Sequence, residues 1–248
     1  MNLVALLIAI VVAAVLILLT RRIQSGREVG LRPVKGYQAL TNQVGRAVES
    51  GRRVHVSLGR AALNTSTSPT SLAALAALDH LAQDGSAADV PPIVTVGEGT
   101  LLPAAQDQLR GAYTQVGRSK DYNNTMVEFV APDSSPMSYA AGVSDVVQHN
   151  NVGSNLLLGH FGPEVGIILE AAGRQNMDQI VGSDDPMALA VGAAMSDELL
   201  IGEELFAAGA YLKGSPSQIA SLQVQDILRL LVVAAILLFA VINLLLGA

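Results

Sequence analysis

The 248-residue sequence contains neither cysteine nor tryptophan, and each absence excludes a class of function. Without cysteine the chain cannot form disulfides, thiolate metal sites, iron–sulfur centres or a cysteine nucleophile. With no tryptophan, four phenylalanines and five tyrosines, it is poor in the aromatic side chains that stack on sugars or bases. Charged residues are also scarce, at 15%, and the net charge is −6 with no basic cluster. We therefore expect no nucleic-acid partner.

Apolar residues are abundant instead, at 50% of the chain, and the mean hydropathy is +0.43. Residues 3–19 are all Leu, Val, Ala or Ile, and residues 230–246 are apolar except for Asn243. A helix of either length could cross a hydrocarbon core about 30 Å thick. Because Arg21 and Arg22 follow the first run rather than precede it, a cleaved signal peptide is not indicated. The pattern predicts transmembrane anchors at residues 1–22 and 227–248.

The basic residues beside these two runs predict an orientation. They all lie on the side of the central segment: Arg21, Arg22, Arg27, Arg32, Lys35 and Arg229. The positive-inside rule then places residues 23–226 in the cytoplasm and both termini outside the cell (inner) membrane. Membrane lipid is accordingly an expected partner.

The two predicted anchors carry features that are typical of helix packing in lipid. Ala5, Ala9 and Ala13 recur every four residues, so they share one helix face and allow close approach. Asn243 could form a hydrogen bond across a helix interface, within one chain or between copies. We therefore assign these four residues to helix packing rather than to transport.

The central segment predicts an α/β fold with a mostly parallel, Rossmann-like sheet flanked by helices. Short β-rich runs alternate with alanine-rich amphipathic stretches, which is typical of repeated βα units. The expected strands are residues 54–58, 93–96, 126–130, 155–158, 179–181 and 199–201. Serine, aspartate or glycine before proline predicts helix starts near residues 68, 135, 162, 185 and 215. The last helix is expected to continue through residue 246.

Ligands of open parallel sheets bind beyond the carboxyl ends of the strands. The candidate ligand-binding residues in the turns that follow the predicted strands are Gly97, Glu98, Gly99, Thr100, His160, Glu164, Asp184 and Glu203. Their carboxylates could hold a divalent cation or a hydroxyl-rich ligand. Alternatively, the acids merely stabilise the starts of the following helices.

No established catalytic or cofactor motif accompanies these residues. The run from Val94 to Thr100 lacks the spacing of a dinucleotide fingerprint and of a phosphate-binding loop. Ser57 is followed by Gly59 but lacks the full flanking pattern of a nucleophile elbow. We therefore predict no cofactor and assign no catalytic residue, and we leave the metal undecided.

The chain resembles an uncharacterised prokaryotic family of two-anchor membrane proteins, a domain of unknown function. The segments that carry the resemblance are residues 54–59, 94–97, 200–211 and 221–229, together with Gly162 and Glu164. The resemblance implies the same architecture over nearly the whole chain, but it implies no activity and no catalytic residues.

Two functions remain open from the sequence. The first is a membrane-anchored, non-enzymatic structural or assembly protein, whose α/β domain packs into a homo-oligomer or a larger membrane complex. The second is a small-molecule or divalent-metal binding module, with or without enzymatic activity, at the acidic carboxyl edge of the sheet. The absence of a catalytic constellation favours the first.

Overall fold

The computed structural model describes residues 3–25 and 30–246, and the chain divides into two compact units. One unit, Pro33–Lys213, holds the sheet. The other consists of the two ends of the chain, Met1–Arg32 and Gly214–Ala248. Residues 1–2 and 247–248 of the predicted anchors, and Arg27 beside the first, lie outside the described residues.

A six-stranded parallel sheet with the order β3-β2-β1-β4-β5-β6 forms the centre of the larger unit. The strands are β1 (Arg53–Gly59), β2 (Ile93–Val96), β3 (Val127–Phe129), β4 (Val152–His160), β5 (Asp178–Ser183) and β6 (Glu198–Ile201). All six predicted strands are thereby confirmed, as is the mostly parallel α/β class of this unit. Helices on both faces of the sheet bury it, which explains the nearly continuous apolar strand sequences.

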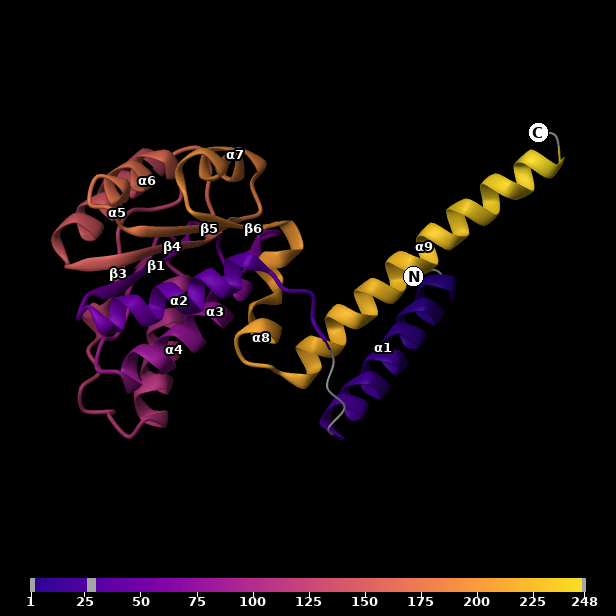
Figure 1. Ribbon diagram of the computed structural model, residues 1–248, viewed down its shortest axis with the longest axis horizontal. Coiled ribbons are helices and arrows are strands. Elements are labelled where there is room, and N and C mark those ends of the chain that lie inside the picture. Colours follow the sequence, from indigo (N-terminus) through magenta and orange to yellow (C-terminus); the bar gives the residue numbers. More distant parts are fainter. Residues whose placement is uncertain (1–2, 26–29, 247–248) are drawn as a thin grey trace. The chain divides into compact units, whose positions relative to one another are not determined.

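The helices cover the sheet in two layers (Figure 1). One layer contains α2 (Lys35–Glu49), α3 (Ser68–Ala87) and α4 (Leu101–Gln115), and the other contains α5 (Pro136–His149), α6 (Val165–Gly173) and α7 (Pro186–Met195). Shorter helical segments follow β6 or precede β3, namely η1 (Asn124–Met126), η2 (Gly202–Ala207) and α8 (Ala208–Tyr211). Proline in the first turn starts α3, α5 and α7 as predicted. Asp185 caps α7 by accepting hydrogen bonds from the N–H groups of Met187 and Ala188.

Polar side chains form a hydrogen-bond chain across the sheet, inside the apolar core. His55 on β1 lies between Thr95 on β2 and Asn155 on β4, at 3.0 Å from Nε2 and 2.7 Å from Nδ1. The Asn155 amide nitrogen donates to Gln179 on β5 over 3.4 Å, and Gln179 donates to the carbonyl of Leu169 in α6 over 3.2 Å. The Asn155 oxygen is therefore the atom that faces His55. His55 must carry its proton on Nδ1 and accept from Thr95 at Nε2.

The same chain extends toward the carboxyl ends of the strands through Tyr139 of α5. The Tyr139 hydroxyl lies 2.6 Å from Ser57 Oγ and also forms a hydrogen bond with Thr95. Burial raises the pKa of Tyr139 to about 12, and the hydrogen bonds with Ser57 and Thr95 oppose that rise. We call the connected residues the polar ladder; they are Ser57, Tyr139, Thr95, His55, Asn155 and Gln179. Because every member is buried and hydrogen-bonded, the ladder helps to fix the order and register of β2, β1, β4 and β5.

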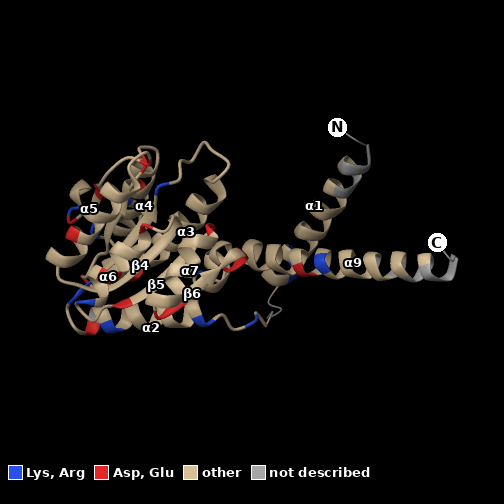
Figure 2. Ribbon diagram, turned by 90° about the horizontal axis from the view of Figure 1, so that it is seen from above, with Lys and Arg blue, Asp and Glu red and all other residues tan. Residues whose placement is uncertain are grey.

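The smaller unit contains α1 (Leu3–Gln24) and α9 (Pro216–Leu246), which contact each other. The 31-residue length of α9 confirms that the last helix is continuous through residue 246. Its charged residues, Asp226 and Arg229, lie in its first half, and the sequence from Leu230 onward has none (Figure 2). Ala9 and Ala13 of α1 are exposed, Asn243 of α9 is half-buried, and the side chain of Ala5 lies outside the described residues.

The prediction of two membrane anchors is contradicted. Counted over the residues that the structure describes, no helix provides a stretch long and apolar enough to cross a membrane. A span needs about 20 consecutive, predominantly apolar residues. In α9 the continuous stretch with described side chains, residues 216–234, includes Gln223, Gln225, Asp226 and Arg229. The corresponding stretch of α1 is residues 9–24, which ends in polar and basic residues. The inner-membrane location with a cytoplasmic central domain, which depended on these anchors, is corrected with them.

Candidate functional site

The strand order places a topological switch point between β1 and β4, where the two halves of the sheet begin. The chain leaves β1 toward α3 on one face and leaves β4 toward α6 on the other (Figure 1). Ligands of open α/β sheets bind in the crevice that such diverging connections create. A binding site at this edge would therefore be formed by the residues that follow β1, β2, β4 and β5.

A buried ion pair occupies the centre of this edge. Arg60, directly after β1, donates from Nε and Nη2 to Oε1 of Glu164, over 3.0 and 2.8 Å. Its Nη1 donates to the backbone carbonyl of Asp133 over 3.0 Å and also to the carboxylate of that residue. The side chains of Arg60 and Glu164 are only 8% and 3% exposed. Glu164 also accepts from the N–H of Gly162 over 2.9 Å. Glu164 therefore has two internal hydrogen-bond partners, Arg60 and Gly162.

The glycine-rich turn after β2 is also explained by internal contacts. A side chain at Gly97 would place Cβ 2.7 Å from Arg60 and 2.9 Å from the Tyr139 ring, so glycine is needed for their packing. Glu98 accepts hydrogen bonds from the Thr100 N–H over 2.5 Å and from the Thr100 hydroxyl. Burial alone would raise the pKa of Glu98. The hydrogen bonds from Thr100 and the nearby N–H groups of Gly99 and Leu101 outweigh burial and lower that pKa.

His160 and Asp184 form the most open polar pair at this edge. His160 ends β4, and its Nδ1 lies 2.7 Å from Oδ1 of Asp184, which follows β5. The other oxygen of Asp184 accepts from the Thr70 hydroxyl in the first turn of α3 over 2.8 Å. The two side chains remain 30% and 26% exposed. An aspartate that accepts from Nδ1–H leaves Nε2 as a hydrogen-bond acceptor or proton acceptor.

The structure therefore brings together some of the predicted site residues and separates others. Gly97 and Glu164 meet at Arg60, Glu98 pairs with Thr100, and His160 pairs with Asp184. Gly99 has open space around its Cα, and its substitution would meet no steric barrier. Glu203 lies in η2 after the edge strand β6, and β1, β4 and β5 separate that strand from β2. Glu203 and Glu98 consequently cannot share one small-molecule site.

Two residues of this edge were not singled out from the sequence. Arg60 was missed, and the signal that could have identified it is its position directly after a buried strand. Thr70 was missed because a threonine in a first helical turn more commonly serves the helix itself. Among the described residues, no three acidic or histidine side chains cluster closely enough to hold a metal ion.

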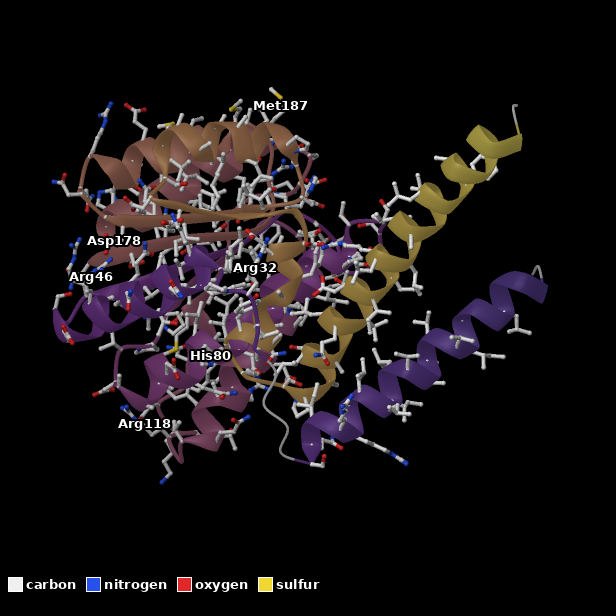
Figure 3. All side chains as sticks on the ribbon, turned by 45° about the vertical axis from the view of Figure 1, so that its right-hand side comes forward. Arg32, Arg46, His80, Arg118, Asp178 and Met187 are labelled. Atoms are coloured by element: carbon white, nitrogen blue, oxygen red, sulfur yellow. The ribbon has the colours of Figure 1, made fainter. Side chains whose placement is uncertain are left out.

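A depression lined by polar and charged residues lies at the opposite, amino edge of the sheet. It has a volume of about 430 Å³ and is lined by Arg46, Ala47, Glu49, Ser50, Arg52, Gly153, Asn176 and Asp178. Arg46 and Asp178 lie beside each other there (Figure 3) and form an ion pair of 2.7 Å. Their side chains are 58% and 38% exposed. Exposed pairs of this kind contribute little and do not define a site.

Comparison with known proteins gives a family but no activity. No curated protein and no solved structure matches the chain significantly. A profile of one family matches residues 1–247, which is nearly the whole chain and confirms the family resemblance seen in the sequence. The prokaryotic and membrane attributes of that resemblance receive no support from the match. The chain belongs to the family described as a domain of unknown function, DUF6754.

Proposed function

We propose that this chain is a non-enzymatic assembly protein that associates with copies of itself through helix α9. The observation that carries the proposal is the exposure of α9 beyond its charged segment. Between Leu230 and Phe239, seven large apolar side chains are 53–70% exposed: Leu230, Leu231, Val232, Val233, Ile236, Leu237 and Phe239. Apolar surface left in water is unfavourable by about 25 cal/mol per Å², so a contiguous surface of this kind favours association.

Helix α1 does not provide the missing cover. It leaves its own apolar side chains exposed, among them Ile10, Val11, Ile17 and Leu18, at 55–64%. The sequence from Leu230 to Leu246 contains no charge that would repel an identical helix. The carboxyl edge of the sheet supports the non-enzymatic part of the proposal, because Glu98 and Glu164 already have the internal partners Thr100 and Arg60.

Co-purification of two differently tagged copies in mild detergent tests the proposal. We expect the wild-type copies to co-purify. A double Ile236→Glu, Leu237→Glu variant should reduce their association at least tenfold, or by about 1.4 kcal/mol, because it places charge on two faces of α9. The matched control is Leu72→Glu on α3, where the leucine is 59% exposed but lies in the other unit. Wild-type copies that do not co-purify would contradict the proposal. This holds even if the protein floats with lipid vesicles, because lipid rather than a second copy would then cover the apolar surface of α9.

A second candidate function is favoured by the His160–Asp184 pair. The His160 side chain is 30% exposed, and among the described residues no hydrogen bond is found to its Nε2 atom. Asp184, which itself accepts from Thr70, holds the ring in place. This arrangement fits a small ligand that donates a hydrogen bond to imidazole. The chain would then be a small-molecule binding module, and its α/β unit would be the functional part.

Thermal unfolding of the full chain with added nucleotides, sugars or divalent cations tests this second function. A ligand present at about a hundred times its Kd should raise the stability by about 2.7 kcal/mol. The stabilisation should disappear in His160→Ala and persist in His149→Ala, whose histidine is 70% exposed on α5. If no probe stabilises the protein, or if His160→Ala retains the stabilisation, the binding function is excluded for these ligand classes.

A further inference from the structure

Asn243 is the only polar residue in the sequence from Leu230 to Leu246, and it therefore distinguishes the face of α9 on which it lies from the other faces. Residues at alternating spacings of three and four recur on one side of a helix that pairs with another. Counted in both directions from Asn243, this seam contains Arg229, Val232, Ile236, Phe239, Asn243 and Leu246. The three apolar members with described side chains are 58%, 62% and 67% exposed, so α1 does not cover this side.

We propose that two copies of the chain pair in parallel along this seam, with Asn243 opposite its own copy. The inference rests on the proposed self-association and names its geometry. An amide side chain supplies both a donor and an acceptor, so two asparagines that meet across a two-fold axis can satisfy each other. A single asparagine at such a position favours a parallel pair in one register, because every other register buries the amide without a partner.

The charges at the start of the seam are compatible with the same parallel arrangement. Asp226 and Arg229 lie one turn apart, with their side chains 3.8 Å from each other. In a parallel pair Arg229 meets its own copy in the seam, and Asp226 of the same helix, one turn away, offsets the repulsion between the two arginines. An antiparallel pair would instead place these charges against the apolar half of the partner, where their desolvation is unfavourable.

The absence of cysteine from the sequence permits a direct test by disulfide cross-linking. Ile236→Cys places a thiol in the seam, and Leu237→Cys is its matched control, because the two native side chains are 62% and 61% exposed. On mild oxidation of the full chain in detergent, we expect Ile236→Cys to form a disulfide-linked dimer at least about ten times faster than Leu237→Cys does. Phe239→Cys is a second seam position and should behave like Ile236→Cys.

The outcomes separate the seam from self-association itself. Co-purifying copies that cross-link equally well or better through Leu237→Cys would overturn the seam and leave the proposed function intact. Copies that neither co-purify nor cross-link would overturn both. Asn243→Leu provides an independent check. This variant should still associate, but the preference for Ile236→Cys over Leu237→Cys should fall, since the register has lost its polar determinant. An unchanged preference would contradict the role of Asn243.

Discussion

Acidification from about pH 6.5 to about pH 4 is expected to lower the free energy of unfolding by about 3 kcal/mol through His55 alone. Burial is the main cause that lowers the pKa of His55 from 6.5 to about 4, and the hydrogen bond with Asn155 opposes it. In the unfolded chain the same imidazole titrates near 6.5, so between these values the unfolded state binds more protons. The contribution is therefore fully present above pH 6.5 and is lost as the pH falls toward 4.

Chemical unfolding of the full chain at several pH values measures this effect. The His55→Gln variant should show a smaller change in stability between pH 6.5 and 4, whatever its stability at neutral pH. The control, His149→Gln, alters an exposed histidine and should keep the wild-type pH dependence. Should His55→Gln fail to fold, imidazole nitrogen NMR of the wild type decides instead, because the ladder predicts an Nδ1–H tautomer. A wild-type slope in His55→Gln, or an Nε2–H tautomer, would refute this account of the ladder.

Truncation of Glu164 is expected to be the most damaging substitution at the carboxyl edge. Glu164→Ala should cost about 3–5 kcal/mol, because it leaves the guanidinium of Arg60 buried without its main counter-charge. The matched control is Glu170→Ala, in the same helix. Glu170 pairs with Arg174 over 2.6 Å, but those side chains are 58% and 76% exposed, and such pairs contribute about 0–1 kcal/mol.

Urea unfolding monitored by circular dichroism compares these variants. The double variant Arg60→Met, Glu164→Leu should recover most of the loss, because apolar residues of similar volume can replace a buried pair at little net cost. If Glu164→Ala is no more destabilising than Glu170→Ala, the ion pair does not hold β1 and α6 together. A double variant as unstable as Glu164→Ala would show that packing at this site, rather than the unpaired charge, governs stability.

The order of helices and strands was predictable because local signals are strong in this chain. Strands flanked by glycine or polar turns were recognised from their apolar β-branched residues, and proline after Ser68 or Asp185 identified helix starts. These features act within a few residues and do not depend on the tertiary structure. For the same reason the parallel class could be inferred, although the sheet order could not.

The chemistry of the carboxyl edge was less predictable because it depends on contacts between distant residues. Glu164 was recognised as a candidate, but its partner Arg60 lies 104 positions earlier, and only the fold brings the two together. Gly97 was a candidate ligand-binding residue, and the sequence did not reveal that Arg60 and Tyr139 pack against it. Glu203 was grouped with Glu98, although three strands separate the strands that precede these two residues. The pairing of His160 with Asp184 agrees with their grouping in the sequence analysis.

Exposure of α9 links the fold to the proposed function. The apolar runs at the two ends of the chain suggested membrane anchors, and the structure corrected that prediction while leaving the apolar surface of α9 uncovered. Association with an identical copy would cover this surface and would satisfy Asn243. The α/β unit, whose buried ladder and ion pair are internally satisfied, would then be a stable body carried by the assembly.

The mass of the wild-type protein particle in mild detergent tests self-association most directly. Light scattering combined with absorbance and refractive index separates the protein mass from the detergent. Self-association predicts a protein mass of at least twice the 25.7 kDa of one chain. If the Asn243 seam is the sole interface, the protein mass should be that of two chains. A mass of 25.7 kDa at every protein concentration would contradict self-association.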